Sequence, residues 1–438
     1  MRPFDNSRPG RVRAKGAPLD RAGWTPSQEA LPRLPEQRAE HGGASVFGRG
    51  SPSPLALVRN DRLLGNVDAM AMYCRAHDVL LAPHNKTALS PEVAALQLRE
   101  GAFGLTVANA RQASVVHGWG VRRILIANEV VDPAGLAWIA GALDDPGDPA
   151  EIYVFADSRQ AVALLEEALP VPGPGARMPA PLRVFTELGT PGGRCGARSP
   201  TEALAVARSI GGASPRLALA GVATFEGLLG AERDAATLGR VRRLTRDALE
   251  LAGHIAGEGL LGAGRGLVTA GGSSFFDGVV DAYLSSAARA AGFRLVLRSG
   301  GYAFHDHGMY ADVSPLDRPG LRRLRPALEL WSSVLSLPEP GTAICDFGRR
   351  DTGSDAGHPV AAGLRTRGGR PKTLPGGIRV TGLNDQHAYL RVPPDHGLAV
   401  GDRLGFGISH PCSTLDRWDV LPAVDEAYRV VGHVTVSL

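Results

Sequence analysis

One lysine stands apart from the other positive charges of this 438-residue chain. There are only three lysines, and Lys86 alone follows a core-like apolar run, whereas Lys15 and Lys372 lie in segments rich in glycine, arginine and proline. Arginine keeps its proton near neutral pH, but a desolvated lysine can become a neutral amine. A neutral amine is what a Schiff base with an aldehyde requires. On this observation alone, an ordinary lysine at a strand end is an equally good interpretation.

A second group with chemical potential is the segment Ser409-His-Pro-Cys-Ser413. The imidazole of His410 and the thiolate of Cys412 suit zinc better than magnesium or calcium. A zinc ion open to substrate would be a Lewis acid that binds a hydroxyl group and helps it to leave. A lone pair of this kind is weak evidence, because most such pairs bind nothing. His387, on a nearby expected strand, could complete or support the site.

The elements that would position these residues follow from an alternation of apolar runs and helical segments that begins near residue 60. Continuous apolar runs are typical of buried parallel strands. The expected strands cover 79–83, 105–108, 123–127, 152–156, 182–187, 217–222, 267–270 and 295–298. The helices are expected at 60–76, from 91 onward, and at 110–118, 133–143, 159–168, 200–210, 234–257 and 277–290.

Eight repeats favour an α/β fold with a (β/α)8 barrel, although alternation alone does not exclude a doubly wound open sheet. Residues at the carboxyl ends of barrel strands do the chemistry, and many barrels bind phosphate with the loops after strands seven and eight. Both loops are rich in glycine and serine here. A lysine after strand one that faces these loops would fit pyridoxal phosphate. The alternative is that the glycine-rich loops are only tight turns. The candidate phosphate-binding residues are Gly271, Gly272, Ser273, Gly300, Gly301 and Tyr302.

The ends of the chain differ from this central region. Residues 1–45 are rich in Arg, Pro, Gly and Ala and are expected to be a disordered basic tail. Residues 46–59 are expected to contain a strand that joins a C-terminal β domain, 60–310 the barrel, and 311–438 that β domain. Expected strands in the last region are 378–381, 388–392, 403–406 and 428–438.

Composition excludes several classes of partner. Residues 1–50 hold nine Lys/Arg and five Asp/Glu, so the net charge of +4 belongs to the tail, and the neutral remainder gives no support for nucleic-acid binding. No apolar run is long enough to span a membrane, and the first residues do not resemble a signal peptide. Four scattered cysteines favour a reducing cytoplasm over a disulfide framework.

Together these motifs resemble the D-serine dehydratase-like branch of fold-type III pyridoxal-phosphate enzymes, which includes D-threonine aldolases, and they are most similar to bacterial amino acid (D-serine) deaminases. The resemblance runs from about residue 46 to the C-terminus. The motifs that carry it are Ala82-Pro-His-Asn-Lys-Thr87, Gly104-Leu-Thr-Val-Ala108, Ala127-Asn-Glu129, Thr269-Ala-Gly-Gly-Ser273, Arg298-Ser-Gly-Gly-Tyr302, His305-Asp-His-Gly-Met-Tyr310 and Ile408-Ser-His-Pro-Cys-Ser-Thr414.

The resemblance implies a fold of the alanine racemase type and a role for each matching residue. Lys86 would carry the cofactor, with His84 and Arg194 beside it, and His410 and Cys412 would bind the metal. In the dehydratase branch the metal pair is His-x-Cys with zinc, whereas D-threonine aldolases typically carry an aspartate at the second position and a harder metal. Asn85 and Glu129 depart from the family pattern, which leaves the exact substrate open.

The implied function is that of a pyridoxal-phosphate- and zinc-dependent dehydratase of a D-3-hydroxy amino acid such as D-serine, giving a 2-oxo acid and ammonia. The alternatives are retro-aldol cleavage to glycine and an aldehyde, an amino acid racemase or epimerase, and a non-catalytic pyridoxal-phosphate-binding protein. The retained metal pair argues against the last of these. A homodimer is expected from the resemblance, with no nucleic acid or membrane as partner.

Overall fold

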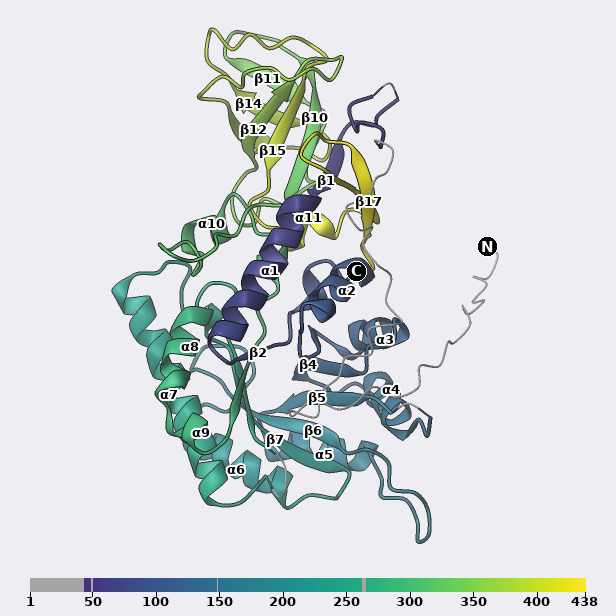
Figure 1. The fold of residues 1–438 in the computed structure, drawn as a ribbon, viewed down its shortest axis with the longest axis vertical. Coiled ribbons are helices and arrows are strands. Elements are labelled where there is room, and N and C mark those ends of the chain that lie inside the picture. The colour runs from purple at the N-terminus through teal and green to yellow at the C-terminus, as the bar shows by residue number, and fades with distance from the viewer. Residues whose placement is uncertain (1–42, 49, 148, 262–264) are drawn as a thin grey trace.

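The computed structural model describes residues 43–48, 50–147, 149–261 and 265–438. Figure 1 shows a β-rich body, built from the C-terminal part and one N-terminal strand, above a larger body of alternating strands and helices. Most of the expected disordered tail (1–42) lies outside the described residues. No helix of the described ranges is long and apolar enough to cross a membrane.

Eight parallel strands form the sheet of the larger body, in the order β2-β9-β8-β7-β6-β5-β4-β3. Backbone hydrogen bonds from Phe103 to Leu81 (2.7 Å) and from Thr106 to Pro83 (3.0 Å) join the two end strands. All eight apolar runs predicted from the sequence are strands, which confirms the predicted α/β fold class. The strands are β2 (Leu80–Leu81), β3 (Leu105–Val107), β4 (Arg123–Glu129), β5 (Glu151–Ala156), β6 (Leu182–Leu188), β7 (Leu217–Thr224), β8 (Leu267–Ala270) and β9 (Arg294–Leu297).

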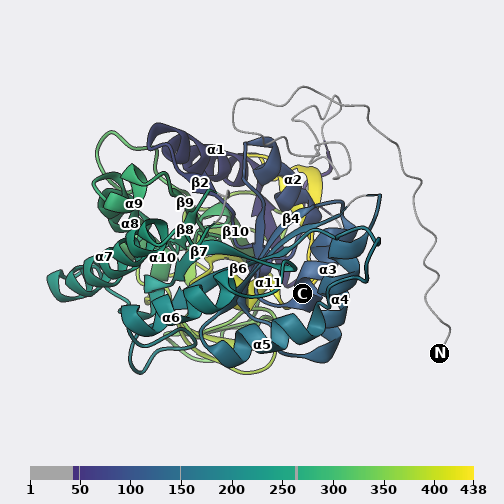
Figure 2. The ribbon, with the colours of Figure 1, turned by 90° about the horizontal axis from the view of Figure 1, so that it is seen from below.

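Helices surround these strands, as the view in Figure 2 shows. Several helices begin at a side-chain cap directly after a strand; Ser158, for example, accepts the backbone N–H of Ala161. Such caps fix where the chain turns, and therefore which residues remain in the loops above the strands. The helices are α1 (Asn60–Ala76), α2 (Pro91–Arg99), α3 (Ala110–Gly118), α4 (Pro133–Asp144), α5 (Arg159–Ala168), α6 (Pro200–Gly211), α7 (Ala235–Gly257), α8 (Phe276–Leu284) and α9 (Ala287–Ala290).

The single helix predicted over 277–290 is wrong in one respect, because two helices occupy this stretch. α8 ends at Leu284, and Ser286 then caps α9 by accepting the backbone N–H of Arg289 at 3.2 Å. Serine side chains offer the backbone a hydrogen bond that competes with helix continuation. The consecutive serines Ser285 and Ser286 therefore explain the break.

A second sheet of nine strands contains the C-terminal part of the chain together with β1 (Leu55–Arg59). β1 lies inside this sheet, antiparallel to β10 and parallel to β16. The remaining strands are β10 (Leu328–Ser336), β11 (Thr342–Cys345), β12 (Val360–Arg365), β13 (Arg379–Leu383), β14 (Ala388–Arg391), β15 (Arg403–Gly407), β16 (Val420–Val424) and β17 (Val430–Thr435). The short helices α10 (Met309–Val313) and α11 (Cys412–Leu415) lie between the two bodies in Figure 1.

Candidate active site

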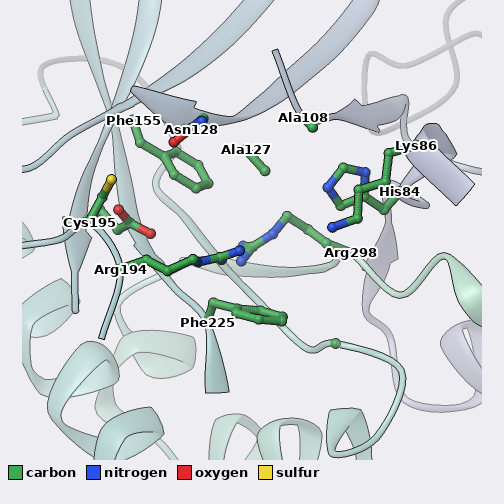
Figure 3. A pocket seen from close by; sticks show the side chains of 12 residues that line it. His84, Lys86, Ala108, Ala127, Asn128, Phe155, Arg194, Cys195, Phe225 and Arg298 are labelled. Atoms are coloured by element: carbon green, nitrogen blue, oxygen red, sulfur yellow. The ribbon is translucent and has the colours of Figure 1, made fainter. Parts of the chain in front are cut away.

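A cavity lies where the loops that follow the parallel strands converge (Figure 3). Its walls come from β4, β5 and β6 and from the segments that follow β2, β3, β6, β7, β8 and β9, as expected for the carboxyl ends of parallel strands. The residues that line it are His84, Lys86, Ala108, Ala127, Asn128, Phe155, Glu187, Arg194, Cys195, Phe225, Gly272 and Arg298.

Lys86 enters this cavity from the single-turn helix Asn85–Thr87, which follows β2 (Figure 3). Burial lowers the pKa of its amine below the usual value. The charge of Cys412 opposes this effect, while the positive charges of Arg194 and Arg298 lower the pKa further. The surroundings therefore favour the neutral amine that attack on an aldehyde requires.

Two arginines give the cavity a cationic wall. Arg298 donates to the Thr269 hydroxyl (2.8 Å) and to the Thr224 carbonyl (2.7 Å), and burial lowers its pKa to about 10. The guanidinium of Arg194 lies 4.7 Å from the centre of the Phe225 ring. Such a wall suits an anionic ligand, for example a phosphate ester or a carboxylate.

His84 is held as a neutral imidazole. Burial lowers its pKa well below the ordinary value, and the charge of Lys86 lowers it further. Its buried Nδ1 has no hydrogen-bond partner among the residues that the structure describes. A buried polar atom without a partner is uncommon in a folded protein, and here it lies on the wall of a cavity that a ligand could fill.

The glycine-rich loops after β8 and β9 lie close to this wall. Gly271 has a φ of +86°, and a Cβ atom on Gly300 would lie 2.2 Å from the carbonyl oxygen of His84. Both positions therefore need glycine, which leaves the backbone of these loops open to a close ligand. Together with the buried amine and the cationic wall, these loops fit a flat aldehyde cofactor with a phosphate group, such as pyridoxal phosphate.

A hydrogen-bond acceptor from the segment after β7, to which the sequence assigned no role, contacts the loop after β8. The carboxylate of Glu226, which is fully buried, accepts the backbone N–H groups of Gly271 (3.1 Å) and Gly272 (2.6 Å). These amides therefore suit an anion, but a carboxylate of the chain already occupies them. A phosphate would need other donors of the two loops or would have to displace Glu226.

The other predicted phosphate residues face different partners. Ser273 makes a side-chain hydrogen bond to Tyr310, and a Cβ on Gly301 would lie 2.5 Å from the Tyr310 ring. Tyr302 is buried, and its hydroxyl accepts a hydrogen bond from Gln97 at 3.1 Å. The Tyr302 side chain does not line the cavity, so its assignment to the cofactor rests on its backbone alone.

The candidate metal pair belongs to the C-terminal part of the chain and lies close to the lysine. Cys412, at the start of α11, donates its thiol hydrogen to the hydroxyl of Thr87 at 3.6 Å, directly beside Lys86 in the chain. Burial raises the pKa of the Cys412 thiol, but its hydrogen bond with His410 and the positive charges of His410 and Lys86 leave the pKa below the usual value. The hydrogen bond to Cys412 is the main reason that the pKa of His410 rises to about 9.

An imidazole and an easily ionised thiol in hydrogen-bond contact are a donor set that fits zinc. The described ranges hold no group of three or more His, Cys, Asp or Glu side chains placed to bind a metal. The hypothesis that His387 completes such a site is therefore wrong. His387 lies in the turn between β13 and β14, where its carbonyl accepts the N–H of Asn384.

Two glutamates form a buried acidic pair at the cavity. Glu187 lines the cavity with 7% of its surface exposed, and its pKa rises to about 8 because of burial and the neighbouring charge of Glu129. With a pKa of about 8, Glu187 keeps its proton at neutral pH. Sequence reasoning singled out Glu129 only as a departure from a family pattern and did not identify the pair.

This pair predicts an unusual dependence of stability on pH. Because the folded protein binds a proton that the unfolded chain releases at the ordinary value of 4.5, the free energy of unfolding falls as the pH rises toward about 8. Glu187→Gln removes this titration, so thermal unfolding should show a Tm that declines less between acid and alkaline pH, by a few degrees. The control Glu167→Gln, at an exposed position of α5, should behave like the parent; equal slopes for all three proteins would contradict the prediction.

Comparison with known proteins gives a consistent set of relatives. Residues 327–424, which include His410 and Cys412, match the family described as a putative serine dehydratase domain. Over 351 residues the chain is 29% identical to a D-threonine aldolase of Arthrobacter sp, and this alignment covers 78% of this chain and 82% of that one.

Solved structures extend the likeness to nearly the whole fold. The D-threonine aldolase of Filomicrobium marinum superposes with a TM-score of 0.73 at 23% identity, covering 90% of this chain and 97% of that chain. The D-threo-3-hydroxyaspartate dehydratase of Delftia sp. HT23 gives a TM-score of 0.67 at 23% identity, covering 90% and 99%. A histidine-to-alanine mutant of that dehydratase has also been solved, as has a cysteine-to-alanine mutant in a metal-free form.

An alanine racemase of Clostridium difficile 630 superposes with a TM-score of 0.60 at 14% identity, covering 89% of this chain and all of that chain. At such identities structural likeness shows the fold alone. It confirms the predicted fold of the alanine racemase type.

Proposed function

Since the chain belongs to the D-serine dehydratase-like and D-threonine aldolase family of fold-type III pyridoxal-phosphate lyases, we propose that it is a pyridoxal-phosphate- and zinc-dependent dehydratase. Its substrate would be a D-3-hydroxy amino acid, with D-serine as the default, and its products a 2-oxo acid and ammonia. One observation carries the proposal: the thiol of Cys412 is hydrogen-bonded to Thr87, next to Lys86, so a candidate metal ligand lies beside the residue that carries the reactive amine.

When bound, pyridoxal phosphate supplies an aldehyde carbon and a ring that accepts electrons from Cα, and zinc supplies a Lewis acid. Lys86 would hold the cofactor and, once its amine is free, remove the Cα proton at Nζ. The lowered pKa of this amine favours the neutral base. His410 and Cys412 would hold the metal, and Arg194 and Arg298 would balance the negative charges of cofactor and substrate.

The nature of the metal pair supports dehydration over its main rival. A thiolate and an imidazole favour zinc, which would supply there a Lewis acid suited to the departure of a β-hydroxyl group. The matched relatives also include a dehydratase whose cysteine-to-alanine mutant was solved metal-free. We propose that Cys412 is the corresponding metal ligand in this chain.

Retro-aldol cleavage is the second candidate, and one observation favours it: the matched relatives include D-threonine aldolases of two organisms. The same lysine and metal could serve this reaction if the proton were removed from the β-hydroxyl group instead of Cα. The products would be glycine and an aldehyde. A racemase or epimerase would use the same base without breaking a bond at Cβ.

A product assay separates these reactions. The protein loaded with pyridoxal phosphate and zinc is incubated with D-serine, D-threonine and D-threo-3-hydroxyaspartate, and the products are identified. We expect pyruvate and ammonia from D-serine, and no glycine from D-threonine. Glycine and acetaldehyde from D-threonine, with D-serine unchanged, would establish the aldolase instead. Absence of turnover for every β-hydroxy amino acid would contradict both.

The resemblance also leads us to propose a homodimer. Light scattering on the purified protein measures its mass in solution, and twice the 45.9 kDa of the chain is expected.

A further inference from the structure

A carboxylate outside the cavity contacts the candidate metal ligand His410. Asp355 lies in the loop between β11 and β12, 55 positions before His410 in the chain. Its Oδ2 atom is 2.6 Å from Nδ1 of the His410 ring. No motif in the sequence marks this residue, and the proposed reaction does not use it.

Asp355 is itself held in place by a second contact. The hydroxyl of Ser413 donates to Oδ1 of Asp355 at 2.5 Å, so both carboxylate oxygens are engaged. Ser413 belongs to α11, the helix that begins at Cys412. The aspartate therefore connects the imidazole of His410 to the helix that carries the other ligand candidate.

At Gly353 the loop between β11 and β12 passes so close to α11 that only glycine fits. A Cβ atom on Gly353 would lie 2.2 Å from the Ser413 hydroxyl and 2.9 Å from Oδ1 of Asp355. The φ angle of Gly353 is ordinary, so the need for glycine is steric and arises from this contact. The backbone is thus shaped to bring Asp355 and Ser413 together.

The geometry decides which ring nitrogen of His410 is available. A histidine that donates Nδ1–H to a carboxylate presents its other nitrogen, Nε2, as the electron-pair donor, and this arrangement orients metal-binding histidines in many proteins. Cys412 also contacts the His410 ring. With Nδ1 held by Asp355, Nε2 is the atom left for the metal.

An alternative role in stability is too small to explain this arrangement. The side chain of Asp355 is 53% exposed and that of His410 is 23% exposed. A pair that is this accessible to water contributes little to the free energy of folding. Such a contact is sufficient to orient a ligand, because a hydrogen bond can fix the direction of a histidine ring without contributing much to stability.

We propose that Asp355, held by Ser413, is the positioning residue of the metal site, which fixes the tautomer and the ring orientation of His410. The proposal rests on the proposed function only in taking His410 and Cys412 as the metal ligands. Loss of such a partner typically weakens metal affinity about 10- to 100-fold.

Zinc affinity of the full-length protein, measured by competition with a chromogenic chelator, tests the proposal without reference to activity. We expect Asp355→Ala to weaken zinc binding about 10- to 100-fold. Asp355→Asn keeps an acceptor oxygen and should recover part of the affinity, and Ser413→Ala should cost less than Asp355→Ala. The control Asp395→Ala removes the same charge from an exposed loop of the same sheet and should leave affinity unchanged.

Two further measurements separate the possible outcomes. The thermal midpoint of the Asp355 variants should stay within a few degrees of the parent, so that weaker zinc binding does not reflect unfolding. His410→Ala, measured in parallel, should abolish zinc binding at this site. If His410→Ala loses zinc and Asp355→Ala keeps full affinity, the positioning role is wrong while the metal pair stands. If His410→Ala binds zinc like the parent, the metal assignment itself fails, and the positioning role with it.

Discussion

Lys86→Ala is expected to abolish turnover of any D-3-hydroxy amino acid and, at the same time, the visible absorbance of cofactor attached to the protein. The variant lacks both the amine that attacks the aldehyde and the base that removes the Cα proton. Loss of a general base alone typically costs about 100- to 10,000-fold in rate, so activity should fall below detection. The free energy of unfolding should change little, because burial of this amine does not stabilise the folded protein.

Lys372→Ala is the matched control, because it removes the other lysine of the described ranges. Lys372 pairs with Asp402 at 2.9 Å in the second sheet, and its loss should leave absorbance and turnover intact. The measurement is an absorbance spectrum of each purified protein before and after reduction with borohydride. Attached cofactor in Lys86→Ala, or its absence in Lys372→Ala, would contradict the assignment.

Cys412→Ala is expected to produce a different defect, in which the cofactor stays attached while zinc and elimination are lost. The variant keeps Lys86 and its cationic wall but removes the thiolate ligand of the metal. Without the Lewis acid the β-hydroxyl group is a poor leaving group, and several kcal/mol of transition-state stabilisation are forfeited. Metal content by mass spectrometry and pyruvate release from D-serine are measured on the same preparation.

Cys345→Ala controls for loss of a thiol elsewhere in the C-terminal part of the chain. Cys345 is fully buried in β11, so its replacement should lower the thermal midpoint without changing metal content. Elimination by Cys412→Ala with no zinc bound would show that zinc is not the Lewis acid. Cys412→Asp offers a carboxylate in place of the thiolate and should shift the metal preference from zinc toward manganese.

The parallel strands were readable from the sequence because each is buried on both faces and so forms a continuous apolar run. The second sheet was harder, since only some of its strands were predicted. In β10 the run is interrupted by Glu329, which is buried in contact with several polar side chains, among them Arg59 from 270 positions away. In β16 a proline, Pro422, argues against a strand, and β12 has the low β-propensity of Ala-Ala-Gly.

The residues of the candidate site were likewise predictable only in part. Lys86, His410 and Cys412 could be singled out by residue type and spacing alone. Glu226 could be seen at a strand end, but its contact with two loop amides depends on backbone geometry. Asp355 could not be found, because a lone aspartate in a glycine-rich loop carries no signal until the fold brings it to His410.

The place of β1 has a consequence for how the chain is made. β1 is the first described strand to leave the ribosome, yet its neighbours β10 and β16 begin only at Leu328 and Val420. Strands β3 to β9 can pair in order as they emerge, whereas β1 must wait until β10 and β16 have been made. A fragment that starts at residue 311 would lack this strand and leave the edges of β10 and β16 open to wrong pairing. The candidate metal ligands His410 and Cys412, which lie between β15 and β16, are therefore fixed in place only after β1 has joined this sheet.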